Sequence, residues 1–256
     1  MYDAKNYYTN MVEVAQKDPD ILGLVLDGSR GKGFATPFSD YDVSLIVRDA
    51  AIRRVETRFQ DCPADVELFV YTLNTFAKLA AWDSEEVWHR YNYTHLTAQV
   101  DKLNGRIQTL IDEKGCIPSD KVAGVINRSL DHYINQTYRS LTCLRNEDKI
   151  GYHFEASEAV RPLLTALFAL HDGRLLPYYK YLRWELVIFP LDQWPWDADD
   201  FLQILQQILA TGDYQAQQQL LREAESLFRS NGYGQVFDDW QGQDQWAMTF
   251  RPNNEL

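Results

Sequence analysis

The chain has 256 residues, of which 45% are hydrophobic, and it carries a formal net charge of −12 at pH 7. Proteins that hold tRNA or DNA need basic surfaces to neutralise phosphates, and so this acidic balance argues against polymerases and tRNA-end-adding enzymes. The sequence has no apolar run of about 18 residues or more, and we therefore expect no membrane-spanning helix.

The first predicted elements are an amphipathic helix over residues 2–17 and a buried strand over residues 21–26, which read Ile-Leu-Gly-Leu-Val-Leu. Asp18-Pro19-Asp20 ends the helix and leads into the strand. A turn-rich segment from Gly31 to Phe38 follows, and residues 43–47 have the pattern of a second strand. The chain therefore begins as helix, strand, turn and strand.

Two acidic residues, Asp40 and Asp42, stand at the start of the second strand. Side chains alternate between the two faces of a strand, and so these two project to the same side. Neighbouring carboxylates repel each other unless a cation lies between them. Mg²⁺ suits such a site, because one or two carboxylates usually bind it together with substrate phosphates.

A third acid follows on the next predicted strand. Residues 49–60 have the pattern of an amphipathic helix, and residues 64–71 that of a strand in which Asp65, Glu67 and Phe69 share a face. If this strand lies beside the Asp42 strand, Glu67 can reach the metal or an attacking hydroxyl. Asp65 is the alternative for that role.

The order of strand, Gly28-Ser29 turn, Asp40-x-Asp42 strand, helix and acid-bearing strand resembles the polymerase-β-like nucleotidyltransferase superfamily. Within it, the chain is most similar to antibiotic adenylyltransferases of the aminoglycoside type and to their bacterial relatives. The motifs cover roughly residues 20–72, and the rest matches in the order of elements alone. The resemblance implies an α+β fold, in which a nucleotidyltransferase domain with a small mixed sheet precedes an all-α helical-bundle domain.

The resemblance also implies roles for the motif residues. Gly28 and Ser29 would cradle the β- and γ-phosphates of a nucleotide, where backbone donors at a helix start favour phosphate. Arg30 and Lys32 would add positive charge there, the alternative being that both are solvated loop cations.

The acids have the corresponding metal roles. Asp40 and Asp42 would bind two Mg²⁺ ions, or one ion with the nucleotide bringing another. Glu67 would ligate one ion or act as general base toward the acceptor hydroxyl.

Beyond the motifs, we predict a mostly helical stretch over 75–91, an edge strand over 95–100 and a helix over 106–114. A junction near residues 115–120 divides a nucleotidyltransferase domain, 1–115, from a helical substrate-binding domain, 116–256. The helices expected there cover 120–145, 151–171, 176–189, 198–210 and 213–230, and Pro162 is expected to kink or break the second. Residues 231–256 show little periodicity and are expected to be extended or frayed.

Three residues of the helical domain are candidates for ligand contacts. Glu155 and Glu158 lie three positions apart, which makes them helix neighbours able to hold ammonium groups of a cationic substrate. A solvated helix face is the alternative for both. A lysine of the helical domain contacts the triphosphate in antibiotic adenylyltransferases, and Lys180 matches it by position.

The sequence thus predicts a Mg²⁺-dependent transfer of a nucleoside monophosphate, most directly AMP from ATP, to a hydroxyl of a small acceptor such as an aminoglycoside. The alternatives are the same chemistry on a protein, as in antitoxin-type enzymes, and a degenerate domain that binds nucleotide as a regulator. We expect no nucleic-acid or membrane partner.

Residues 1–6 show no signal-peptide pattern, and Cys62, Cys116 and Cys143 are odd in number and widely spaced. Reduced thiols in the cytoplasm are therefore expected, with neither a disulfide framework nor a zinc site.

Overall fold

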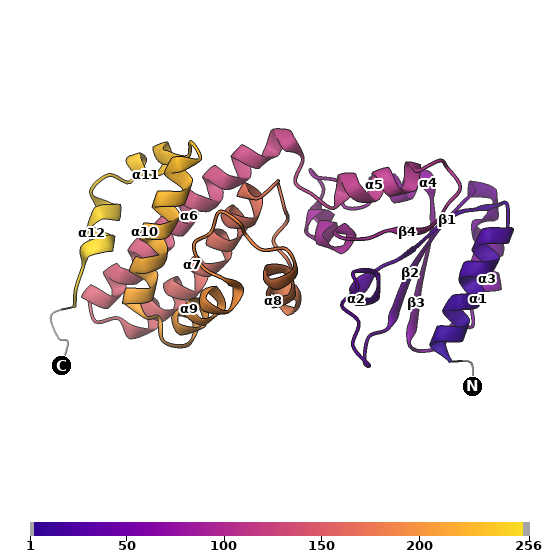
Figure 1. The fold of residues 1–256 in the computed structure, drawn as a ribbon, viewed down its shortest axis with the longest axis horizontal. Coiled ribbons are helices and arrows are strands. Elements are labelled where there is room, and N and C mark those ends of the chain that lie inside the picture. Colours follow the sequence, from indigo (N-terminus) through magenta and orange to yellow (C-terminus); the bar gives the residue numbers. More distant parts are fainter. Residues whose placement is uncertain (1–2, 253–256) are drawn as a thin grey trace. The chain divides into compact units, whose positions relative to one another are not determined.

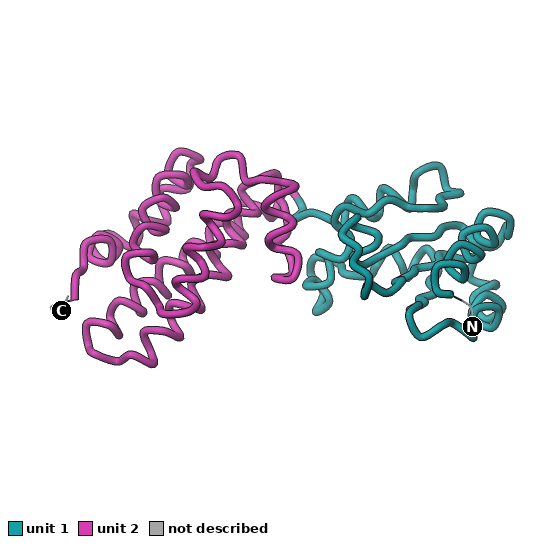
Figure 2. The backbone as a smooth tube through the Cα atoms, turned by 60° about the horizontal axis from the view of Figure 1, so that its bottom comes forward, with its two compact units in different colours: residues 1–118 teal, residues 119–256 magenta. Residues whose placement is uncertain are grey.

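The computed structural model describes residues 3–252. The chain divides into two compact units, Met1–Pro118 and Ser119–Leu256 (Figure 2). The first unit combines a small sheet with helices, and the second is helical. This is the predicted α+β arrangement, in which a part with a small mixed sheet precedes a helical region.

The sheet of the first unit has four strands in the order β3-β2-β1-β4. The antiparallel pairs are β1 with β2 and β1 with β4, whereas β2 and β3 run parallel. The strands are β1 (Ile21–Leu26), β2 (Tyr41–Val47), β3 (Val66–Thr72) and β4 (Ala98–Asp101). A parallel pair needs a crossover connection, which residues 48–65 supply with the short helix η1 (Asp49–Ala51) and α3 (Ile52–Arg58).

Helices cover both faces of this sheet (Figure 1). On one face, α1 (Ala4–Lys17) and α3 pack on Val43, Leu45 and their neighbours to form the larger core. On the other, α4 (Leu73–Lys78) and α5 (Arg106–Lys114) pack on Val25 and Ile46. Since side chains alternate along β2, Asp42 projects to the same face as Ile46. The short helix α2 (Gly28–Gly31) contacts β1 and β2.

The stretch over residues 75–91, predicted to be mostly helical, contains two helical segments separated by a break. The α-helix α4 ends at Lys78, and residues 85–93 form a 3₁₀ segment, η2 (Glu85–Tyr93). The buried Arg90 explains the break, because its guanidinium donates hydrogen bonds to the carbonyls of Ala80, Glu113 and Cys116. These contacts between distant segments outweigh local helix propensity.

The second unit is built around the pair α6 (Ser119–Arg145) and α7 (Lys149–Leu170), whose apolar faces pack against each other. Pro162 does not break α7, which is continuous across it. The remaining longer helices are α8 (Tyr179–Ile188), α9 (Ala198–Thr211) and α10 (Tyr214–Ser230).

The expectation of an extended or frayed C-terminal tail is wrong over most of its length. Residues 231–252 contain α11 (Gly234–Asp239) and α12 (Gln243–Thr249), and residues 253–256 lie outside the described part of the chain. These helices are anchored from a distance, since Trp240 donates a hydrogen bond to Asp131 on α6 and Gln218 on α10 donates to the carbonyl of Ala247. Such anchors leave no periodicity in the local sequence.

Two further expectations concern the described residues as a whole. None of the helices in residues 3–252 combines the length and apolarity needed to cross a bilayer. Cys62, Cys116 and Cys143 are all free thiols.

Two glycines allow a matched test of packing around α2. A Cβ added at Gly31 would overlap the carbonyl of Leu26 and press on the Leu96 side chain, whereas one added at Gly124 in α6 would meet an Arg128 side-chain nitrogen at 3.7 Å. We expect Gly31→Ala to lower the free energy of unfolding by about 1–3 kcal/mol. Gly124→Ala should raise it by up to about 1 kcal/mol, because glycine is a poor helix former. Urea denaturation measures both, and equal effects would contradict the close packing of α2.

Candidate active site

The parallel register of β2 and β3 places Asp42 directly opposite Glu67. Neighbouring strands lie about 4.8 Å apart and paired residues share a face, and so the two carboxylates project side by side. Asp42 is half-buried and Glu67 is exposed. The structure thus brings together two of the three predicted acids at the end of the sheet where α2 lies.

Gly28 packs directly against Asp42. Its φ is +61°, in the left-handed region that favours glycine, and a Cβ added there would overlap Oδ2 of Asp42. A hydrogen bond of 2.7 Å from the Asp27 backbone N–H to the Asp42 carbonyl joins the same two segments. Gly28 therefore leaves room for the Asp42 carboxylate beside the turn.

The first residues of α2 offer backbone donors next to these acids. The initial N–H groups of a helix have no acceptor within that helix, and here they belong to Gly28, Ser29 and Arg30. The Ser29 hydroxyl donates to Oγ of Ser39 at 2.7 Å, which ties α2 to the loop that leads into β2. The phosphate contacts predicted for Gly28 and Ser29 stay predictions.

Asp40 lies immediately before β2 and is exposed. It lines a cavity of about 560 Å³ together with Arg30, Tyr41 and Asp65. The Tyr41 backbone N–H donates to the Asp65 carbonyl at 2.9 Å, which fixes the start of β2 beside the start of β3. Asp65 is thus the neighbour of Asp40, whereas Glu67 is the neighbour of Asp42.

Arg30 binds the chain itself. Its Nε donates to the carbonyls of Ser39 at 3.1 Å and Asp40 at 2.9 Å, and its Nη2 donates to Ser39 at 2.6 Å. The guanidinium also lies 4.2 Å from the centroid of the Tyr41 ring. Arg30 thereby fixes the backbone at Asp40, a role that the sequence did not predict. Its predicted contact with nucleotide stays a prediction.

Lys32 is buried, and its ammonium group is hydrogen-bonded to the protein chain. Its Nζ donates to the carbonyls of Tyr91, Asn92 and Thr94 and to the Thr94 hydroxyl, at 2.6 to 3.1 Å. These bonds fasten the end of α2 to η2. The alternative of a solvated loop cation is therefore wrong for Lys32, and its predicted charge contribution to a triphosphate stays a prediction.

Asp27 is an acid of the site that sequence reasoning missed. Its carboxyl accepts a hydrogen bond of 2.6 Å from the Ser44 hydroxyl, one position beyond Val43 on β2. The pKa of Asp27 is raised from 3.8 to about 7, chiefly by burial; the hydrogen bond from Ser44 and the charge of Lys32 lower it, and the charge of Asp42 raises it. The sequence contained a sign of this role, because Asp27 stands between the apolar strand that ends at Leu26 and the Gly28 turn.

Aromatic rings continue the sheet face beyond Glu67. The rings of Phe69 and Tyr71 stack with a 6.2 Å separation of centroids and an 8° angle between planes. Burial raises the pKa of Tyr71, and the charges of Asp27, Glu86 and Glu67 raise it further. Glu86, from η2, is therefore another acid near this face.

The donor set can be tested against the magnesium that was predicted. Within residues 3–252, no three His, Cys, Asp or Glu side chains converge as a closed metal site. The structure offers the adjacent pair Asp42 and Glu67, with Asp40 at the border. Mg²⁺ commonly takes one or two protein carboxylates and completes its shell with water and substrate phosphates. The residues fit a metal that arrives with a nucleotide, and ligation by all three acids stays a prediction.

The candidates of the helical unit lie on two helices. Glu155 and Glu158 are on α7, where Glu155 is half-buried and Glu158 is exposed. Lys180 is on α8, and its Nζ lies 4.9 Å from the centroid of the Tyr181 ring. Their predicted contacts with acceptor and nucleotide stay predictions.

Comparison with known proteins found a family match that lies within the first unit. Residues 1–62 match the streptomycin adenylyltransferase family model. A solved structure, the nucleotidyltransferase-like protein from Exiguobacterium sibiricum 255-15, is similar at 12% identity and a TM-score of 0.41, covering 92% of this chain and 78% of that chain. Among curated proteins nothing matches.

The family match supports the predicted relationship of the first unit to nucleotidyltransferase enzymes. It includes Gly28, Ser29, Asp40 and Asp42. It ends before Glu67 and before the helical unit.

The Asp27 carboxyl predicts a pH dependence of stability. Its pKa in the folded chain is about 7, above the ordinary value of 3.8, so the native state keeps a proton that the unfolded state releases between these values. The free energy of unfolding should therefore fall as pH rises from about 4 to about 7. With chelator present, Asp27→Asn should remove this slope and stabilise the protein at pH 8 by on the order of 2–4 kcal/mol, with little effect at pH 4. Equal effects at both pH values, or the same result for the exposed Glu56→Gln, would contradict it.

The hydrogen bonds of Arg30 predict that replacing it with lysine lowers the stability of the fold. Lysine keeps the positive charge but lacks the fork that reaches two carbonyls at once. We expect Arg30→Lys to lower the free energy of unfolding by about 1–3 kcal/mol. Arg53→Lys, at an exposed position of α3, is the matched control and should change it by less than about 0.5 kcal/mol. Urea denaturation compares the two, and an Arg30→Lys variant as stable as its control would show that these bonds do not matter.

Proposed function

We propose that the first unit transfers a nucleoside monophosphate, most directly AMP from ATP, to a hydroxyl group of a small acceptor. The observation that carries this proposal is the placement of Asp42 opposite Glu67, beside the Gly28 turn that leaves space for the Asp42 carboxylate. The match of residues 1–62 to a family of adenylyltransferases supports the choice of AMP.

In this proposal the substrates react by direct displacement. The acceptor oxygen forms a bond to the α-phosphorus while the bond to the β-bridging oxygen breaks, and pyrophosphate leaves. Glu67 takes the proton of the acceptor hydroxyl, a task that suits an exposed carboxylate next to the reacting groups. Asp65, which lies beside Asp40 at the border of the site, is the alternative base.

Asp42, Asp40 and Glu67 would hold Mg²⁺. The metal would supply positive charge that polarises the α-phosphate and stabilises the departing pyrophosphate. The free backbone donors at the start of α2, on Gly28 and Ser29, would orient the β- and γ-phosphates. Most of the acceleration would then come from positioning and from neutralised charge.

The acceptor is less closely defined than the nucleotide. The family match covers the first 62 residues, and the acids and helices that would choose an acceptor lie outside it. An aminoglycoside-like acceptor agrees with the family named by the match and with the net charge of −12, which attracts cationic molecules. Lys180 and the pair Glu155 and Glu158 are the helical-unit residues proposed to contribute to such contacts.

Release of pyrophosphate tests the reaction. The protein is incubated with Mg²⁺, each labelled nucleotide and a panel of aminoglycosides, and acceptor-dependent release with a nucleotidylated product is the expected result. Asp42→Asn should reduce the rate on the order of 10³-fold or more, because it removes a charge that balances the metal. Glu67→Gln should reduce it about 10²- to 10⁴-fold, as expected for a lost general base.

The controls separate the roles of the acids. Asp65→Asn should keep most of the activity, and none of the three variants should unfold at a lower urea concentration than the wild type. Loss of activity in Asp65→Asn with an active Glu67→Gln would transfer the third role to Asp65. Full activity in Asp42→Asn would refute the site, and label on a polypeptide in place of a small molecule would refute the acceptor class.

A further inference from the structure

The helical unit contains a cavity of about 660 Å³ between α7, α8 and α9. Ligand sites for small molecules are typically this large, mostly apolar, and provided with a few polar groups. The cavity fits this description, since its wall is largely aliphatic and its other lining residues are polar or charged. The aliphatic side chains are Val160, Leu164, Leu182, Leu202, Leu205 and Leu209.

Part of this apolar surface remains open to solvent. Leu209 on α9 is 49% exposed and Tyr179, at the start of α8, is 57% exposed. Deeper in the wall, Leu164 and Leu205 are buried. The cavity therefore has an apolar interior that can be reached from outside, and filling it would remove apolar surface from water.

Two opposite charges stand among the lining residues. Glu158 and Arg161 are exposed and lie three positions apart on α7, which makes them neighbours on one side of the helix. Within residues 3–252, neither side chain forms a hydrogen bond or an ion pair. Both charges act on Tyr179: burial raises the pKa of its hydroxyl most, Arg161 lowers it and Glu158 raises it. One anion and one cation are thus available beside the apolar wall.

Pro162 adds an acceptor to this group. A proline has no N–H, and so the helical bond that residue 162 would donate to the carbonyl of Glu158 is missing. Glu158 therefore offers a carboxylate and a main-chain carbonyl that lacks its usual donor. An ammonium group has three donors and matches such a pair, while the fork of Arg161 matches a carboxylate.

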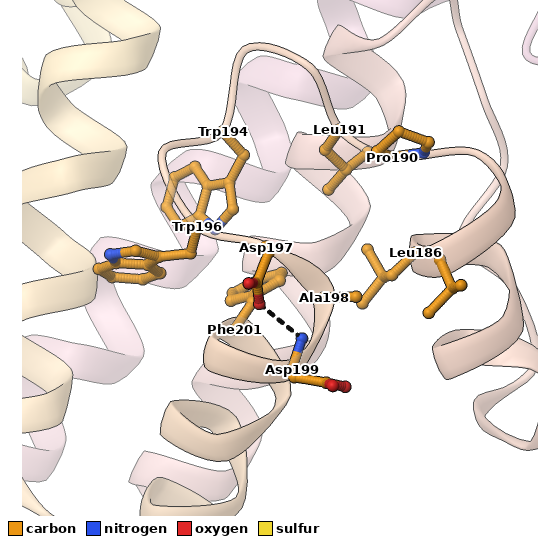
Figure 3. A pocket seen from close by; sticks show the side chains of 10 residues that line it. Leu186, Pro190, Leu191, Trp194, Trp196, Asp197, Ala198, Asp199 and Phe201 are labelled. Carbon is orange, nitrogen blue, oxygen red and sulfur yellow. Dashed lines mark hydrogen bonds between the residues drawn. The ribbon is translucent and has the colours of Figure 1, made fainter.

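A second cavity of the same unit shows what a pocket without available charges looks like (Figure 3). It measures about 290 Å³ and is lined by Trp194, Trp196 and Phe201 among others. Its two acids are already engaged, because Asp197 caps the start of α9 and Asp199 forms an ion pair of 2.9 Å with Arg183. The larger cavity differs from it in having unengaged charges of both signs.

We propose that the cavity between α7, α8 and α9 binds a small zwitterion with an apolar body, that is, a molecule of the type of a hydrophobic amino acid. The body would lie against the leucine wall, the ammonium group at Glu158 and the carboxylate at Arg161. A polyhydroxylated polycation fits this cavity poorly, since it would leave hydroxyls against leucines and bring like charge to Arg161. The site goes beyond the proposed transfer reaction and shares one residue with it, Glu158, whose contact with the ammonium group of the zwitterion here takes the place of the acceptor contact proposed above.

Calorimetric titration of the full chain, with neither nucleotide nor metal present, tests this site. The probes are L-phenylalanine, L-alanine, N-acetyl-L-phenylalanine, phenethylamine and kanamycin. L-phenylalanine should bind, and each of the other four should bind at least about tenfold more weakly, because each lacks the apolar body, one of the charges, or both.

Matched variants locate the binding. Glu158→Gln and Arg161→Gln should each weaken L-phenylalanine at least about fivefold, and Leu202→Asn should do the same through the apolar wall. Glu223→Gln on α10 and Arg128→Gln on α6 are the controls, since neither residue lines the cavity, and both should leave the affinity unchanged. Circular dichroism and urea midpoints check that each variant is folded.

Several results would overturn the proposal: no heat with L-phenylalanine, equal affinity for the probes that lack one charge, tighter binding of kanamycin, or folded cavity variants that bind as well as their controls. None of these outcomes alters pyrophosphate release by the first unit, which Asp42→Asn tests separately. Failure of the cavity and failure of the transfer reaction are therefore distinguishable.

Discussion

Parallel pairing of β2 with β3 sets Asp42 opposite Glu67, and the remaining features of the candidate site surround this pair. Two like charges on neighbouring strands weaken the sheet unless positive charge reaches them. The first unit contains fixed cations nearby, but Arg30 and Lys32 are hydrogen-bonded to backbone carbonyls. Both cations thus bind the chain itself, and we propose that a metal arriving with the substrate supplies the positive charge.

The turn between β1 and β2 is held by hydrogen bonds within the connection that leads to these acids. Ser29 bonds to Ser39 and Arg30 bonds to the backbone of residues 39 and 40, so both ends of the long connection are tied together. Lys32 fastens the far end of α2 to η2. Asp27 adds a cost to this arrangement, because a carboxyl kept near Asp42 by burial must hold its proton to a higher pH than usual.

Sequence reasoning succeeded where the signal was local. The bounds of β1 and α5 agree with the prediction, and the family match supports the predicted relationship. The Glu67 strand lies beside the Asp42 strand, which was the condition for Glu67 to reach the site; its parallel orientation was not predicted. It failed where a distant partner decides the structure. Arg90 ends α4 by binding carbonyls from two other segments, and Trp240 anchors the tail to α6. Patterns of residue spacing reveal only interactions between residues close in the sequence. The partners of Arg90 and Trp240 are far away in the sequence, and so no such pattern predicts them.

The contacts of Arg30 and Lys32 illustrate a more general limit. A glycine-serine turn followed by two cations resembles a phosphate site, because phosphate and backbone carbonyl both accept hydrogen bonds from the same donors. In the sequence alone, a cation that binds a ligand and one that binds its own chain are indistinguishable. Burial separates them: Lys32 is 6% exposed, whereas Glu158 and Arg161 lie exposed beside an apolar cavity without partners. Exposure beside the cavity therefore makes Glu158 and Arg161 candidates for contact with a small molecule. Sequence spacing alone could not distinguish them from charges on a solvated helix face.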